Sequence, residues 1–220
     1  MNKYKTLFIV ALVAIFASCS DNDDEKDSDN STVELTVDYE SHAIDLGLSV
    51  RWANMNVGAE TEDDLGNYFA WGETEPKDTF KLSTYQYYDN DYIYIGNNIE
   101  TTTYDAARAN WGGKWRMPTK NELKELVEQC DWKWEWGTTF NTFGYRVVGP
   151  NGNSIYLPAA GGYTKDSDPS NLWNKNDFGY YWMSTLETKG LASLLRFNKN
   201  KPTIEINDVY KGMSVRAVVE

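Results

Sequence analysis

The clearest pattern of apolar and polar positions along the chain predicts one main helix over about residues 119–130. Apolar side chains occupy the first, fourth, fifth and eighth positions of Leu123–Cys130, which places them in one stripe of an α-helix. Thr119 and Glu122 have the spacing of a capping box, in which each side chain accepts a hydrogen bond from the other residue's backbone N–H. Because Cys130 lies on the apolar stripe, we expect its thiol to be buried and unreactive.

Elsewhere, short apolar runs between turn residues predict strands. Tyr145–Val148 and Ser154–Leu157 flank the turn-rich segment Gly149–Asn153, which is typical of a hairpin. Further strands are expected at Tyr68–Trp71, Tyr180–Ser184, Leu191–Phe197, Thr203–Asn207 and Ser214–Val219. A shorter helix is expected at Tyr104–Asn110, because its central alanines favour helix. Many short, mostly antiparallel strands with one main helix indicate the α+β class.

The first residues follow the plan of a secretory signal. Lys3 and Lys5 precede an apolar run, Leu7–Ala17, that is too short to span a bilayer, which takes roughly 20 residues in a helix. Small residues then lead to Cys19. We therefore predict a signal peptide over residues 1–18.

The segment around Cys19 resembles the bacterial lipobox, in which the cysteine thiol is acylated and the residue becomes the new N-terminus. Several acyl chains, each worth about 0.8 kcal/mol per buried CH₂, make a durable anchor. Residues 20–31 carry six acids and one lysine and nothing apolar, so we expect residues 19–38 to be a lipidated, acidic tether. This tether resembles the export signal of Bacteroidetes lipoproteins for the outer face of the outer membrane. The alternatives are an ordinary cleaved signal with an incidental cysteine, and a plain linker.

The remaining residues, 39–220, are expected to form a single globular domain, which is long enough to bury a sizeable core. The chain has a formal net charge of −12, which repels phosphate backbones and makes nucleic acid an unsuitable partner. The chain has nine tryptophans and fifteen tyrosines but few aliphatic runs, so many of these rings are expected to fill the core. We expect some of these rings to line a binding surface, since Tyr and Trp combine apolar area with a polar group.

Seven ordered motif blocks carry a family resemblance. They are Asp45–Ala53, Asn56–Ala59, Tyr68–Glu73, Ala109–Thr119, Gly149–Gly161, Tyr181–Thr185 and Ser214–Val218. Together, over roughly residues 43–219, they resemble the Fibrobacter succinogenes major paralogous domain, and more distantly the C-type-lectin-like fold of formylglycine-generating enzymes. The resemblance implies a C-type-lectin-like domain with paired N- and C-terminal strands and long loops on one face. It does not by itself imply a function.

The residue types argue against most catalysis. Formylglycine-generating enzymes hold copper with a cysteine pair, whereas this domain has Cys130 alone; relatives often carry a cysteine where Met55 stands. His42 is the only histidine, it stands at an expected strand start, and no pattern assigns it a serine partner. Zinc requires clustered Cys and His, which the chain lacks. We expect no catalytic residues and no cofactor, with a carboxylate-based enzyme left open.

Calcium is the one metal that the sequence leaves possible. Asp166, Asp168, Ser170 and Asp177 have part of the spacing of an EF-hand loop, but no helices are expected on either side. Residues 75–77 and 173–174 are also similar, in part, to the sugar-binding tripeptides of C-type lectins.

Aromatic segments supply the candidate ligand-binding residues. These are Tyr85, Tyr87, Tyr88, Tyr92, Tyr94 and Trp173. The tyrosines lie among aspartates and asparagines that keep their segment wet, so exposed rings are expected to stack on sugars or anchor a protein. Trp132, Trp134 and Trp136 alternate as on one face of a strand, and that face either closes the core, which we favour, or is exposed.

The leading hypothesis is a lipid-anchored, cell-surface binding module of the outer membrane without enzymatic activity. Its ligand would be a glycan or an envelope protein, bound by loops around residues 80–100 and 163–178. One alternative is a structural or assembly subunit of a surface appendage. The other is a carboxylate-based enzyme of unknown substrate.

Overall fold

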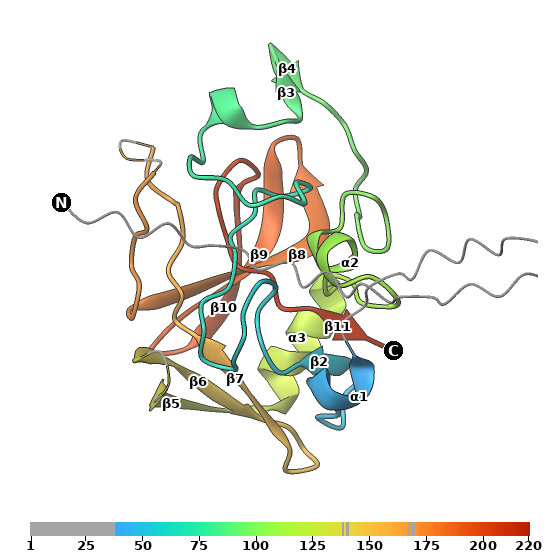
Figure 1. Ribbon diagram of the computed structural model, residues 1–220, viewed down its shortest axis with the longest axis vertical. Coiled ribbons are helices and arrows are strands. Elements are labelled where there is room, and N and C mark those ends of the chain that lie inside the picture. Colours follow the sequence, from blue (N-terminus) through green and yellow to red (C-terminus); the bar gives the residue numbers. More distant parts are fainter. Residues whose placement is uncertain (1–37, 138, 140, 167, 169) are drawn as a thin grey trace, which may run out of the picture. The chain divides into compact units, whose positions relative to one another are not determined.

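The computed structural model describes residues 38–137, 139, 141–166, 168 and 170–220 (Figure 1). Contacts divide the chain into two units at Val33 and Glu34, and every described residue belongs to the second unit. The predicted signal peptide, the lipid anchor Cys19 and all of the tether except Asp38 lie outside the described residues. The predictions for those segments therefore stay predictions.

Short helices and antiparallel strands make up the described domain. The helices are α1 (Tyr39–His42), α2 (Ala106–Trp111) and α3 (Lys120–Gln129), with a 3₁₀ turn at Leu82–Thr84. The strands are β1 (Ala43–Ile44), β2 (Arg51–Ala53), β3 (Tyr88–Asp89), β4 (Asp91–Tyr92), β5 (Asp131–Gly137), β6 (Thr142–Val148), β7 (Ser154–Pro158), β8 (Phe178–Thr188), β9 (Leu191–Asn198), β10 (Pro202–Asp208) and β11 (Val218–Val219). All pairs of these strands are antiparallel. The α+β class predicted from the sequence is thus confirmed.

Helix α3 begins as its capping box predicts. The Glu122 backbone N–H donates to the Thr119 hydroxyl at 3.3 Å, and the Thr119 N–H donates to the Glu122 carboxylate at 2.8 Å. The helix ends at Gln129, and Cys130 follows with an extended backbone. Cys130 is therefore half-buried rather than buried as predicted, and burial still raises the pKa of its thiol to about 11.

The strands form three three-stranded sheets and one small hairpin, β3–β4. The predicted hairpin around Gly149–Asn153 is confirmed as β6–β7, with β5 added at its outer edge. The pairing of N- and C-terminal strands that the family resemblance implies is confirmed in the order β1-β2-β11, with Trp52 opposite Val218.

One expected strand is absent, and two others have different bounds from those predicted. Tyr68–Trp71 makes a single bridge, between Phe69 and Met213, because the chain turns at Gly72, where φ is 83°. Of Ser214–Val219, only Val218 and Val219 form a strand, β11, and Ser214 makes an isolated bridge with Tyr181. The strand expected to start at His42 begins one residue later, as β1 at Ala43, because His42 ends α1; its Nδ1 lies 3.2 Å from the Asn54 side-chain oxygen.

Strands β8 and β9 of the sheet β10-β9-β8 contribute residues to two hydrophobic clusters, one on each face of the sheet. Successive strand residues point to opposite faces. Accordingly Trp182 and its partner Leu194 belong to one cluster, whereas Tyr181 and its partner Leu195 belong to the other. The long loops of residues 54–118 contribute most of the first cluster, and α3 with β6 and β7 contributes to the second.

The tryptophans of β5 divide between the core and the surface. Trp132 and Trp134 are half-buried and pack edge-on against Tyr145, at ring distances of 5.2 and 5.1 Å. Trp136 is 44 % exposed, and its ring meets that of Phe143, itself 37 % exposed, at 4.4 Å. The prediction that this face closes the core therefore holds for Trp132 and Trp134. It fails for Trp136, because the hairpin extends beyond the core at that residue.

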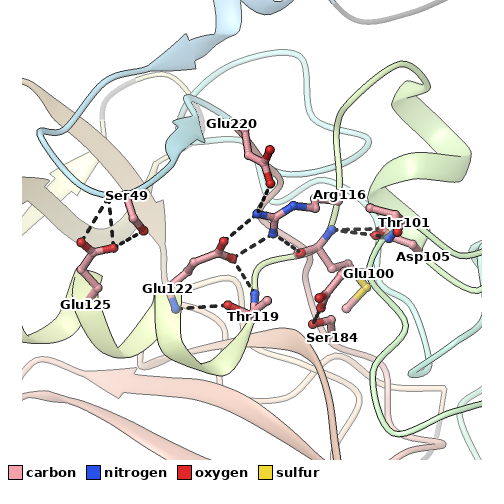
Figure 2. A network of polar contacts seen from close by, with 11 residues as sticks. Ser49, Glu100, Thr101, Asp105, Arg116, Thr119, Glu122, Glu125, Ser184 and Glu220 are labelled. Atoms are coloured by element: carbon pink, nitrogen blue, oxygen red, sulfur yellow. Dashed lines mark hydrogen bonds and ion pairs between the residues drawn. The ribbon is translucent and has the colours of Figure 1, made fainter.

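Arg116 and Thr119, both in the motif block Ala109–Thr119, belong to a network of polar contacts at the start of α3 (Figure 2). The Arg116 guanidinium donates to both oxygens of Glu122 on α3, at 2.9 and 2.6 Å. Arg116 also forms an ion pair with Glu220 at 3.7 Å, and its backbone pairs with Val218. The arginine therefore joins the start of α3 to the C-terminal strand.

Two buried tyrosines, Tyr85 and Tyr181, and the half-buried Tyr68 make the fold sensitive to alkali. The hydroxyls of Tyr68, Tyr85 and Tyr181 donate to the backbone oxygens of Ala160, Trp71 and Pro158, at 2.6, 2.8 and 2.7 Å. Burial raises the pKa of all three, that of Tyr181 to about 12. A tyrosine in the unfolded chain ionises at about pH 10. Their contribution to stability is therefore complete below that pH and is lost as the pH rises toward the folded pKa values.

We accordingly expect cooperative unfolding above about pH 10, with these tyrosines ionising only as the fold is lost. Parallel titrations by ultraviolet absorbance and circular dichroism test this. Burial lowers the pKa of Arg216 to about 10, which acts in the opposite direction but through one group only. Ionisation of every tyrosine with full retention of the circular dichroism signal would contradict the prediction.

Candidate functional site

The predicted tyrosine-rich segment folds into the small hairpin β3–β4. Its turn is the single residue Asn90, with φ at 56°, a left-handed conformation that asparagine tolerates better than most residues. Tyr88 and Tyr92 are directly opposite each other, and their rings meet at 5.2 Å with an interplanar angle of 73°. The hairpin therefore presents two tyrosine rings together on one face.

The turn between β8 and β9 holds this hairpin in place. Lys189 in the turn forms an ion pair with Asp91, and the hydrogen bond from Lys189 lowers the pKa of that carboxyl. Gly190 has a φ of 76°, and a Cβ there would lie 2.6 Å from ring atoms of Tyr92. Because only glycine leaves room for this contact, the Tyr92 ring lies directly against the turn.

A pocket of about 330 Å³ lies between the hairpin and the turn. Such a volume is within the usual range for small-ligand sites, roughly 300–1,000 Å³. Its apolar lining consists of Trp71, Tyr85, Tyr92, Ile93, Tyr94, Ile95, Leu186, Gly190 and Val209. The exposed side chains of Asn97, Thr188 and Lys189 add polar groups. We call this the tyrosine pocket.

Three of the predicted site residues meet in the tyrosine pocket. Tyr85 is only 5 % exposed and anchors its hydroxyl on the Trp71 carbonyl, so it contributes a fixed inner wall. Tyr92 is half-buried, and Tyr94 is 70 % exposed. Tyr87 lies behind them, packed edge-on against Tyr85 and Tyr104 at 5.7 and 5.3 Å. The structure therefore gives these tyrosines different roles.

Tyr88 and Trp173 lie outside the tyrosine pocket. Tyr88 lines a second pocket of about 420 Å³, together with Lys81, Leu82, Ser83, Asp166 and Tyr210. Trp173 pairs its backbone with Gly162, and the Lys165 ammonium lies 3.2 Å from the centre of its ring. The expected loops around residues 80–100 and 163–178 do meet, since the Phe80 and Tyr163 rings stack at 4.8 Å.

Sequence reasoning missed the part of the pocket that comes from distant segments. Trp71, Leu186, Thr188–Gly190 and Val209 were not expected there. The Thr188-Lys189-Gly190 sequence is recognisable as a turn between two strands. Nothing in it indicates that the turn contacts a hairpin whose Asp91 is 98 residues away in the sequence.

The expected calcium loop has its first aspartate engaged by other groups. Asp166 forms an ion pair with Lys211, and the Tyr210 hydroxyl donates to it at 3.1 Å. Among the described residues, no group of three or more His, Cys, Asp or Glu side chains is arranged to hold a metal ion. The prediction of no cofactor, with calcium left open, stays a prediction.

No family model, curated protein or solved structure matches this chain. The resemblance to the Fibrobacter succinogenes major paralogous domain therefore stays a prediction made from the motif blocks. Within the part of the chain that the structure describes, none of the helices has the length and apolar character needed to cross a bilayer.

Proposed function

We propose that this protein is a lipid-anchored cell-surface module that binds neutral glycans in the tyrosine pocket, without chemical turnover. The observation that carries the proposal is Tyr94, a tyrosine ring 70 % exposed at an apolar pocket that is also lined by Tyr92, whose ring lies against Gly190. Isolated exposed apolar residues are common on proteins, but a pocket lined by several rings is not. A large, partly exposed aromatic surface of this kind favours ligand binding.

The pocket combines the two kinds of contact that a sugar requires. Tyrosine rings offer apolar faces on which the C–H face of a sugar can lie, and their hydroxyls remain able to form hydrogen bonds. Asn97 and Thr188 offer amide and hydroxyl groups at the same pocket. A few polar groups on a mostly apolar lining are the usual way in which a small-ligand site fixes orientation.

The charges favour a neutral ligand. Lys189, the one lysine in the lining, is already paired with Asp91. The chain as a whole has a formal net charge of −12. Sulfated or sialylated glycans would therefore be repelled by the protein without a free cation in the pocket to offset that repulsion.

The proposal includes the predicted location at the outer membrane and the predicted C-type-lectin-like fold. The acidic tether after Cys19 would hold the domain at the outer face of the outer membrane. The pairing of β2 with β11, and the long loops that form the pocket, support a C-type-lectin-like domain. Both parts rest on sequence motifs, and fold alone does not define the ligand.

The test is an array of neutral and acidic glycans, probed with the full-length protein in detergent, with and without calcium. We expect binding to neutral glycans. Tyr94→Ala should weaken binding at least tenfold, about 1.4 kcal/mol, because it removes the exposed ring. Trp136→Ala is the matched control, since Trp136 is 44 % exposed but lies outside the pocket. A blank array, or equal losses in the two variants, would overturn the proposal.

A second candidate, an assembly subunit of a surface appendage, is favoured by one observation. Trp136 and Phe143 are 44 % and 37 % exposed on the β5–β6 hairpin, and β5 is an edge strand. Exposed aromatic side chains on an unpaired edge are suited to a contact with another protein. Co-purification with envelope proteins that is lost on Trp136→Ala would favour this candidate over glycan binding.

A further inference from the structure

The second pocket has a lining that complements the tyrosine pocket. Lys81, Ser83 and Asp166 contribute charged and hydroxyl groups, and Tyr88 and Tyr210 contribute rings with hydroxyls. The Tyr210 hydroxyl is held in place, since it donates to Asp166 at 3.1 Å and lies 3.3 Å from an oxygen of Asp208. The pocket thus offers several hydrogen-bonding groups beside two aromatic rings.

The two pockets are adjacent, as two independent pairs of residues show. Tyr92 lines the first pocket and Tyr88 the second, and these rings contact each other at 5.2 Å. Val209 lines the first and its neighbour in the chain, Tyr210, the second. The pockets therefore lie on two sides of one ring pair, a separation small enough for one extended ligand to occupy both.

The charges around the second pocket balance, as they do in the first. Lys81 and Asp166 line the second pocket, Asp166 is paired with Lys211, and Asp208 lies beside the Tyr210 hydroxyl. In the first pocket Lys189 is paired with Asp91. A long ligand with charge along its length would find no net opposite charge in either pocket, whereas a chain of uncharged sugars would find rings and hydrogen-bonding groups in both.

We infer that the two pockets form one groove for a neutral oligosaccharide of at least two sugar units, which crosses the Tyr88–Tyr92 ring pair. This inference rests on the proposed function, because it assumes that a sugar occupies the tyrosine pocket. It adds that the preferred ligand is a chain rather than a single sugar. A chain-length dependence of affinity follows, since a second unit bound next to the first adds its contacts without a separate association step.

The experiment measures affinities of the full-length protein for neutral glycans of one to six units, printed as graded-length series of glucans, mannans, xylans and galactans. We expect at least a tenfold gain from one unit to the longer members. Ser83→Trp should remove that gain and leave single-unit binding unchanged, because an indole at this exposed position fills the second pocket without disturbing the core. Ser41→Trp, at another exposed serine distant in sequence from both linings, is the matched control and should keep the gain.

Tyr210→Phe adds a second variant that leaves the ring in place. Loss of its hydroxyl should weaken the longer glycans at least threefold and leave the single sugar unaffected. Equal affinity at every length, or a full gain in Ser83→Trp, would overturn the groove while the proposed function stands. Absence of binding at every length would overturn the proposed function itself, so the two failures are distinguishable.

Discussion

Replacing Arg216 by alanine is expected to lower the free energy of unfolding by about 3–5 kcal/mol, the largest effect of any substitution considered for this protein. Arg216 is 1 % exposed, and its guanidinium donates in three directions. The acceptors are the Asn56 side-chain oxygen at 3.0 Å, the Ala53 carbonyl at 3.0 Å and the Tyr156 carbonyl at 2.8 Å. Alanine would leave all three acceptors buried without a donor.

The geometry makes arginine irreplaceable by lysine or methionine at this position. A lysine has one compact ammonium, which does not reach three acceptors arranged around a planar fork. A methionine fills the volume but donates no hydrogen bond, so the acceptors stay unpaired. Although burial lowers the pKa of Arg216 to about 10, the guanidinium is charged at neutral pH and keeps all of its donors.

Urea unfolding of Arg216→Ala, Arg216→Met and the surface control Arg51→Ala tests this expectation. Arg51 makes one exposed hydrogen bond, to the Glu220 backbone oxygen at 3.1 Å, and its loss should cost well under about 1 kcal/mol. A midpoint for Arg216→Ala close to that of Arg51→Ala would refute the structural role of the buried guanidinium.

Asp105→Ala is expected to cost about 3 kcal/mol or more, the second largest effect. Asp105 is fully buried, and its carboxylate accepts from the backbone N–H groups of Thr101, Arg108 and Met117, at 3.0, 3.0 and 3.0–3.1 Å. It thereby caps α2 and also holds the strand-like segment before α3 (Figure 2). Alanine would leave three N–H groups without this acceptor, the buried one of Met117 and the part-buried ones of Thr101 and Arg108.

The exposed turn residue Asp45 supplies the matched control, because its carboxylate also accepts a backbone N–H, that of Gly47, at 2.7 Å. Asp45→Ala should cost about 1 kcal/mol or less, since water replaces the lost acceptor. The loss of unfolding free energy in Asp105→Asn should lie between these two values. The asparagine amide keeps one accepting oxygen, but its NH₂ group would face backbone N–H groups, which are also donors. Equal unfolding free energies for Asp105→Ala and Asp45→Ala would contradict the prediction.

The contacts of Arg216 and Asp105 give two of the motif blocks a structural role. Arg216 belongs to the closing block Ser214–Val218, and the Met117 amide belongs to Ala109–Thr119. Both blocks are among those that carry the family resemblance. In the structure Arg216 satisfies the carbonyls of Ala53 and Tyr156, and Asp105, from outside the second block, satisfies the Met117 amide; both contacts contribute to stability.

The local elements of the fold could be predicted because their determinants are close together in the sequence. The capping box of α3 joins residues three apart, and the β6–β7 hairpin joins two strands across a five-residue loop. The same reasoning failed at Tyr68–Trp71, where the residues have strand character but the chain finds only one bridging partner, Met213. The presence of a paired neighbour, and not propensity, determines whether such a segment is a strand.

The candidate site was found in part for the same reason. The many tyrosines among aspartates marked the segment as a candidate site. Tyr85 and Tyr94 cannot be told apart from the sequence of this segment, yet they are 5 % and 70 % exposed. Their difference depends on Trp71, whose carbonyl binds the Tyr85 hydroxyl, and on the β8–β9 turn, which covers Tyr92. Amino-acid order alone therefore established the class of fold, its main helix and the segment richest in candidate ligand contacts. Tertiary structure decided which rings form a pocket, because exposure is set by packing between segments about a hundred residues apart, and local periodicity carries no information about such contacts.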